Sequence, residues 1–169
     1  MSKSNTTESN SLAIGDSAPT ADAAKICSDL RYLLADVFAL HLKTKNFHWH
    51  MTGPHFRDLH LLLDEQAEQI FAMTDDIAER ARKIGGDTLR SISDISKHQR
   101  LKDENRQSIR PEEMLAELRA DNLELTRFLL MTHDTCQEHN DVATASLVEN
   151  WIDETQRRAW FLSEVLRSV

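Results

Sequence analysis

The chain has 169 residues, of which 40% are hydrophobic and 28% are charged, with only four glycines, three prolines and two cysteines. This length suffices for one domain with a full apolar core, and the low glycine and proline content favours helices over a sheet with many tight turns. The net charge of −8 argues against a surface that binds nucleic acid by neutralising phosphates and favours one that attracts cations.

The first residues differ in composition from the rest of the chain. Residues 1–19 hold mostly Ser, Thr, Asn and Ala, so we expect a flexible tail ahead of one domain over residues 20–169. The chain has no apolar run with the length of a secretory signal or a membrane span, and we expect a cytoplasmic protein. Cys27 and Cys136 stand outside any zinc pattern, which predicts reduced thiols of minor structural importance.

Four long helices are predicted in chain order. Apolar residues recur at three- and four-residue spacing over residues 20–51 and again from residue 56 to residue 84, where Gly85-Gly86 provides a left-handed cap. Residues 87–110 are a polar connection with a short helix near residues 91–95. Pro111 opens a third long helix that reaches about residue 137, and Asp141 caps a fourth. The pattern predicts an all-α, ferritin-like four-helix bundle with a short extra helix in the long connection between helices two and three.

The second predicted helix has an apolar face and an opposite face rich in metal-ligand residue types. At 100° per residue, His60, Asp64, Asp75 and Glu79 share this opposite face, with Leu61, Glu68 and Phe71 among them. A solvated polar surface is the simpler interpretation of this face, and for Glu68 a surface salt bridge is the main alternative to escorting a metal ion or holding a water.

The spacing of these residues favours a metal site shared between two subunits. His60 and Asp64 are four residues apart, as are Asp75 and Glu79, so each pair can hold one side of a cation. The pairs are separated by roughly 22 Å along the helix. A second copy, packed antiparallel across a two-fold axis, would bring them together. His48, at the end of the first helix, adds to the His60 pair.

Imidazole and carboxylate ligands at an open site suit Fe(II), and zinc is a plausible competitor. A conventional di-iron bundle would place Glu-x-x-His pairs inside one subunit, and this chain has no such pair. The predicted ligand set is therefore His48, His60, Asp64, Asp75 and Glu79.

Residues 46–56, NFHWHMTGPHF, resemble the HWxMxGxxF motif of the Dps family, and residues 75–80, DDIAER, resemble its D-x-x-A-E-R stretch. The resemblance implies a cage of twelve subunits that oxidises Fe(II), preferably with hydrogen peroxide, at centres between subunits. It also implies storage of the ferric mineral inside, which protects DNA and cell from oxidative damage. Trp49 resembles the family tryptophan beside the iron, where it takes up oxidising equivalents or simply packs at the interface.

The resemblance further implies an acidic pore near the junction of the third and fourth long helices. The candidate pore residues are Asp134, Glu138, Asp141, Glu149 and Asp153. For any one of them, solvated surface is an equal alternative.

The rival function is a nucleoid-associated cage that mainly compacts DNA, and a third is a bundle that only scaffolds other proteins. We expect weak DNA binding at physiological salt, because the tail and its boundary with the first helix offer only Lys3 and Lys25 against Glu8, Asp16 and Asp22.

Overall fold

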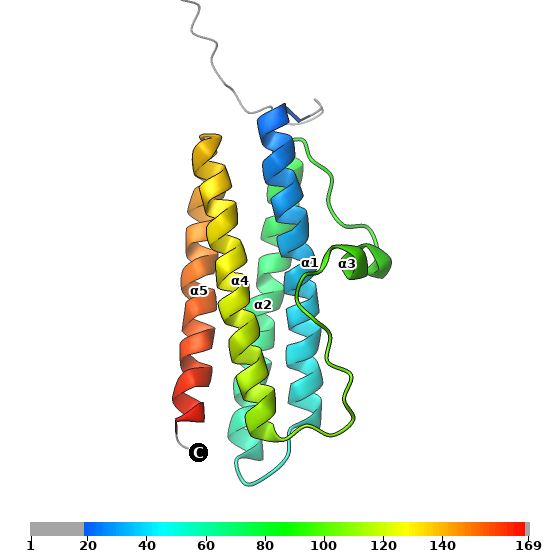
Figure 1. Ribbon diagram of the computed structural model, residues 1–169, viewed down its shortest axis with the longest axis vertical. Helices are drawn as coiled ribbons and strands as arrows, with labels where there is room; N and C mark the ends of the chain where they lie inside the picture. Colours follow the sequence, from blue (N-terminus) through cyan, green and yellow to red (C-terminus); the bar gives the residue numbers. More distant parts are fainter. Residues whose placement is uncertain (1–18, 168–169) are drawn as a thin grey trace, which may run out of the picture.

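The computed structural model describes residues 19–167, which form five helices (Figure 1). They are α1 (Ala21–His50), α2 (Phe56–Lys83), α3 (Ile92–His98), α4 (Pro111–Glu138) and α5 (Val142–Leu166). The all-α bundle is confirmed, and the first three long helices begin and end within one residue of the predicted positions. Residues 1–18 of the predicted tail lie outside the described part of the chain.

The four long helices form one bundle with a single long crossover. Figure 1 shows α1 and α2 running in opposite directions, α4 running in the same direction as α2, and α5 returning beside α4. The connection between α2 and α4 therefore passes along the length of the bundle. It carries α3 and lies against α1.

Local caps explain where the helices begin and end. Thr20 accepts a hydrogen bond from the Ala23 amide at the start of α1, and Asp141 accepts one from the Thr144 amide at the start of α5. At the end of α2, Gly85 has a φ of +85°, which a side chain would disfavour. The next residue, Gly86, lies so close to Cys27 that a Cβ would stand 2.2 Å from its Sγ. The predicted glycine cap is confirmed.

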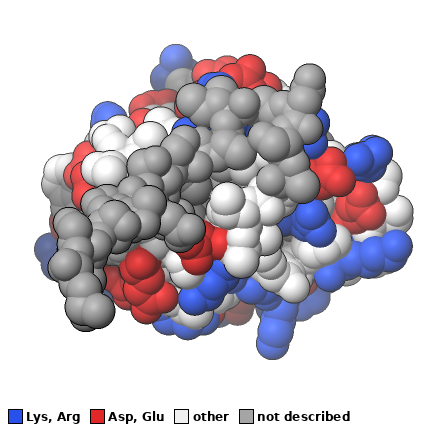
Figure 2. Space-filling view, turned by 90° about the horizontal axis from the view of Figure 1, so that it is seen from above, with Lys and Arg blue, Asp and Glu red and all other residues white. Residues whose placement is uncertain are grey.

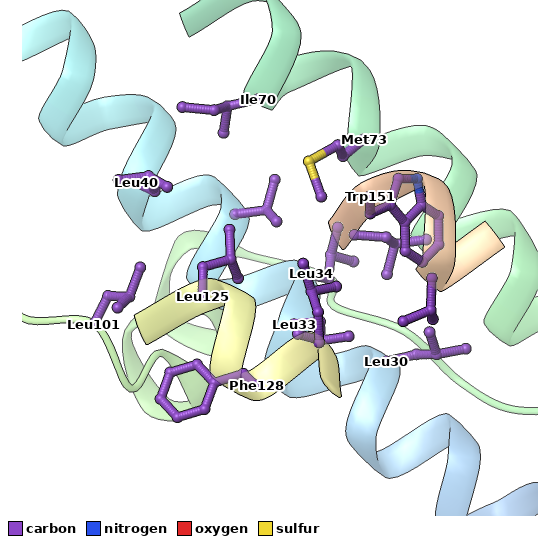
Figure 3. Close-up of a cluster of buried hydrophobic side chains, with 14 of the residues drawn as sticks. Leu30, Leu33, Leu34, Leu40, Ile70, Met73, Leu101, Leu125, Phe128 and Trp151 are labelled. Atoms are coloured by element: carbon purple, nitrogen blue, oxygen red, sulfur yellow. The ribbon is translucent and has the colours of Figure 1, made fainter. Parts of the chain in front are cut away.

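The core draws apolar side chains from every long helix and from the crossover. Figure 3 shows Leu30, Leu33, Leu34 and Leu40 of α1, Ile70 and Met73 of α2, Leu125 and Phe128 of α4, Trp151 of α5 and Leu101 of the crossover. All ten are buried, so the bundle is held mainly by their removal from water.

A buried carboxylate fixes the crossover to α1. Asp36 is fully buried and accepts hydrogen bonds from the backbone amides of Arg100, at 2.5 Å, and Leu101, at 3.0 Å. The Arg100 guanidinium also donates to Asp36 and lies over the Phe128 ring, 3.7 Å from its centroid. These contacts place the crossover beside the half of α1 that leads to His48.

In residues 19–167, we find no helix with the combined length and apolarity that crossing a membrane requires.

Candidate metal centre

His48 and His60 hold each other in place where α1 ends and α2 begins. Nδ1 of each ring lies 2.8 Å from the backbone carbonyl oxygen of the other residue, and the rings stack with centroids 3.7 Å apart. A carbonyl only accepts, so each Nδ1 carries the proton and donates it. Each Nε2 is left with its lone pair, which is the form of imidazole that binds a metal ion. The Phe56 ring packs on His60 from the other side, 5.0 Å away.

Asp64 lies one turn further along α2, beside the same histidines. Its Oδ1 is 3.8 Å from His48 Nε2 and 2.5 Å from the Nζ of Lys45, which donates a hydrogen bond to it. The Lys45 ammonium holds the pKa of the Asp64 carboxyl below its ordinary value, with smaller contributions from the two histidines. Sequence reasoning missed Lys45, although its position three residues before His48 puts it on the same side of α1.

Asp75 and Glu79 are exposed and lie on the same face of α2, toward its other end. Glu79 accepts a hydrogen bond from Lys83 at 2.9 Å, a pair that stays in solvent. Within residues 19–167, no three His, Cys, Asp or Glu side chains come together as a metal site. His48, His60 and Asp64 are neighbours in one subunit without forming a complete metal site, and Asp75 and Glu79 lie apart from them.

Large apolar side chains are exposed around these ligand-type residues. Leu61 and Phe71, on the ligand face of α2, are 48% and 52% exposed. Trp49 is 58% exposed at the end of α1 and lines a groove of about 1000 Å³ between α1 and the crossover. Apolar surface beside charged ligand types favours contact with another protein surface over a fully solvated face.

The interior of the bundle is chemically unsuited to a metal ion. Arg158 is 1% exposed, donates to Asn122 at 3.0 Å and Thr155 at 2.8 Å, and places a positive charge among the helices. Burial lowers the pKa of this guanidinium to about 10, so it stays charged at neutral pH. In residues 19–167 the buried carboxylates are Asp36 and Asp141, and both are paired with arginine. A cation site on the outer face of α2 is the better fit.

Comparison with known proteins shows the family to which the chain belongs. Residues 27–169 match the family model of the ferritin-like domain. Among solved structures, Dps from Thermosynechococcus elongatus is 30% identical and superposes with a TM-score of 0.82, covering 84% of this chain and 90% of that one. The chain belongs to the Dps family.

Curated relatives agree with that placement. The DNA protection during starvation protein of Helicobacter pylori is 29% identical over 79% of this chain and 92% of its own length. A low temperature-induced protein of a Nostoc strain is 35% identical over 76% of this chain and 73% of its own.

The acidic residues at the α4–α5 junction of this Dps-family subunit differ in exposure. Asp134, Glu138, Glu149 and Asp153 are exposed. Glu138 pairs with Lys25 at 3.4 Å, and Glu149 pairs with His133 at 3.0 Å. Figure 2 shows this end of the bundle, where acidic and basic side chains are interspersed.

Asp141 differs from the other candidate pore residues. Its side chain is 1% exposed, caps α5 and binds the Arg80 guanidinium at 2.7 Å. Arg80 also donates to Thr144 at 2.7 Å, so the Asp141 charge is used inside the subunit. The prediction that Asp141 caps the helix is confirmed, and a buried carboxylate paired with arginine offers little charge to a channel.

Proposed function

We propose that this Dps-family subunit oxidises Fe(II) at centres shared by two subunits, with hydrogen peroxide as the electron acceptor, and stores the ferric product inside a cage of twelve. The observation that carries the proposal is the mutual fixing of His48 and His60. It leaves two metal-binding Nε2 atoms beside Asp64, on an exposed face that a second copy can cover.

Each subunit contributes two halves to different centres. His48, His60 and Asp64 form one half and Asp75 and Glu79 form the other. An antiparallel pair of α2 helices joins the first half of one copy to the second half of the other, twice, by symmetry. The exposed Leu61 and Phe71 are then buried by the same contact.

The reaction requires binding and positioning more than covalent chemistry. Two Fe(II) ions supply two electrons and the solvent supplies two protons, which together reduce one hydrogen peroxide to two waters, and the carboxylates offset the charge that the iron gains. Asp64 is ionised at neutral pH, and Fe(II) has to displace Lys45 from it. Zinc would occupy the same ligands without giving up electrons, so it should compete with Fe(II).

The exposed carboxylates Asp134, Glu138, Glu149 and Asp153 are the candidates for an entry route, because focused negative potential raises the local concentration of a cation. Trp49 is exposed at the end of α1, which supports a role in packing between subunits. It also follows His48 directly in the sequence, which suits a role in capturing oxidising equivalents.

An anaerobic Fe(II) titration tests the proposal, followed by matched additions of peroxide and oxygen. We expect two centres per pair of subunits, oxidation that is faster with peroxide, and inhibition by added Zn(II). A protein that assembles but binds no Fe(II) would contradict the proposal and support a scaffolding role.

The rival function of DNA compaction has a separate test. We expect no retardation of long duplex DNA at about 150 mM salt and neutral pH, because a net charge of −8 gives little counterion release. Retardation at submicromolar protein without divalent metal would favour the rival.

A further inference from the structure

The shared site that we propose fixes how two α2 helices must align. In that site, His60 of one copy faces Glu79 of the other, and Asp64 faces Asp75 in the same way. Both facing pairs have the same midpoint on α2, between Gln69 and Ile70. The two-fold axis must pass this point, and there the two helices approach most closely. Glu68 and Phe71 are equally spaced about it, so Glu68 of each copy faces Phe71 of the other.

The neighbour of Phe71 inside the subunit is a histidine. The His41 ring of α1 lies 5.0 Å from the Phe71 ring, and its Nδ1 is 3.0 Å from the carbonyl oxygen of Ala67. Because that carbonyl only accepts, Nδ1 donates, and Nε2 carries the lone pair when the ring is neutral. His41 is half-buried.

Glu68 is exposed and has no hydrogen bond or ion pair within the described subunit. Brought against Phe71 of a second copy, its carboxylate meets His41 Nε2. Two acceptors face each other unless the imidazole gains a proton, and the imidazolium then donates to the carboxylate.

We propose that Glu68 of each subunit binds protonated His41 of the other, forming two symmetric ion pairs at the two-fold axis between the iron centres. This inference rests on the proposed shared site, because that site sets the alignment. It assigns Glu68 and His41 to assembly and gives the subunit contact a dependence on pH.

Other charged groups near His41 already have partners. On α1, Lys45 binds Asp64 of α2. In the crossover, which shares a groove with His41, Glu104 binds Arg106 at 2.6 Å. Asp103 of the same groove accepts from Gln99 at 2.7 Å. Glu68 of the second copy is the carboxylate left to pair with His41.

The direction of the pH dependence follows from the pair. The contact requires an imidazolium and a carboxylate, so it forms below the ordinary histidine pKa of about 6.5 and is lost as pH rises above that range. It also weakens below about pH 4, where glutamate takes up a proton. The contact is therefore strongest near pH 5.5.

A double-mutant cycle in the full chain tests the proposal. The variants are His41→Gln, Glu68→Gln and the double variant, and sedimentation in graded urea measures the dissociation of the assembly at pH 5.5 and 7.5. Every variant retains His48 and His60, so any effect of pH that acts through these two residues cancels in the cycle. The matched control is Glu65→Gln, which makes the same charge change on α2 but lies at the cleft with α5.

We expect coupling between His41 and Glu68 of about tenfold in the dissociation constant at pH 5.5, falling to less than twofold at pH 7.5. Glu65→Gln should shift dissociation by less than twofold at both pH values. Additive effects of the two single variants at pH 5.5 in an assembled protein would overturn this proposal and leave the shared iron site intact. A protein that stays monomeric at both pH values would overturn the shared site and this pair with it.

Discussion

His48 and His60 each accept, through the backbone carbonyl, a hydrogen bond from the other residue's ring, at 2.8 Å in both directions. This relationship fixes both tautomers and both ring positions without using either Nε2. In the iron centre that we propose, both imidazoles are therefore oriented before a metal ion arrives, and little ordering is left for the binding step.

Replacing His60 with Ala should slow iron oxidation by at least tenfold and leave the assembly intact. The side chain supplies a ligand nitrogen, whereas Leu61 and Phe71 are the larger apolar groups of the face. Stopped-flow absorbance after peroxide addition measures the rate, and size-exclusion chromatography reports the assembly. If the variant ran as a monomer, His60 would be a structural residue rather than a ligand.

Replacing Lys45 with Met should tighten Fe(II) binding about three- to tenfold at pH 7. The ammonium that hydrogen-bonds Asp64 is removed, so iron no longer has to displace it, and the Asp64 pKa should rise toward 3.8. Anaerobic titration measures the affinity. Lys97→Met, an exposed site on α3, is the control and should bind iron as the parent does. Weaker binding in the Lys45 variant would mean that Lys45 assists the site.

Replacing Asp36 with Ala should destabilise the subunit by about 3 kcal/mol. The Leu101 amide and the Arg100 guanidinium lose a buried acceptor, and the crossover loses its anchor on α1. Urea unfolding measures the change, and limited proteolysis should show new cleavage in residues 99–110. An unchanged cleavage pattern would show that other contacts hold the crossover.

The two thiols should be inert in the folded protein. Burial raises the pKa of Cys136 to about 12 and also raises that of Cys27, so almost no thiolate is present at pH 8. Neither should react with a thiol reagent or with peroxide until the chain unfolds. Because these pKa values are raised on folding, stability should fall as pH rises from 9 toward 12. Rapid labelling of the native protein would contradict this assignment.

Much of the fold was predictable because its signals are local. The helix ends are marked by residues that act through their own backbone conformation or through contacts with the next turn of the helix. These residues are Thr20, Gly85, Pro111 and Asp141. The ligand face of α2 follows from spacing alone, but the grouping of His48, His60 and Asp64 also required the turn between α1 and α2.

Contacts between distant residues were not predictable. The pairing of Arg80 with Asp141 spans 61 positions, and it buries a residue that the family resemblance made a candidate for a pore. Lys45 reaches Asp64 through a long, flexible side chain whose direction periodicity does not fix. The burial of Arg158 depends on acceptors from α4 and α5, so nothing in its own segment signals it.

The central claim is that one iron centre needs two subunits, and mixing complementary variants tests it most directly. One variant carries His48→Ala and His60→Ala, and the other carries Asp75→Ala and Glu79→Ala. Each alone should be inactive, because every centre lacks part of its ligand set. After random exchange of equal amounts, about half of the pairs are mixed, and in each of these one centre has all five ligands while the other keeps only Asp64. Peroxide-driven Fe(II) oxidation should therefore return to roughly a quarter of the parent rate. No recovery after mass spectrometry has confirmed mixed pairs would contradict the shared centre.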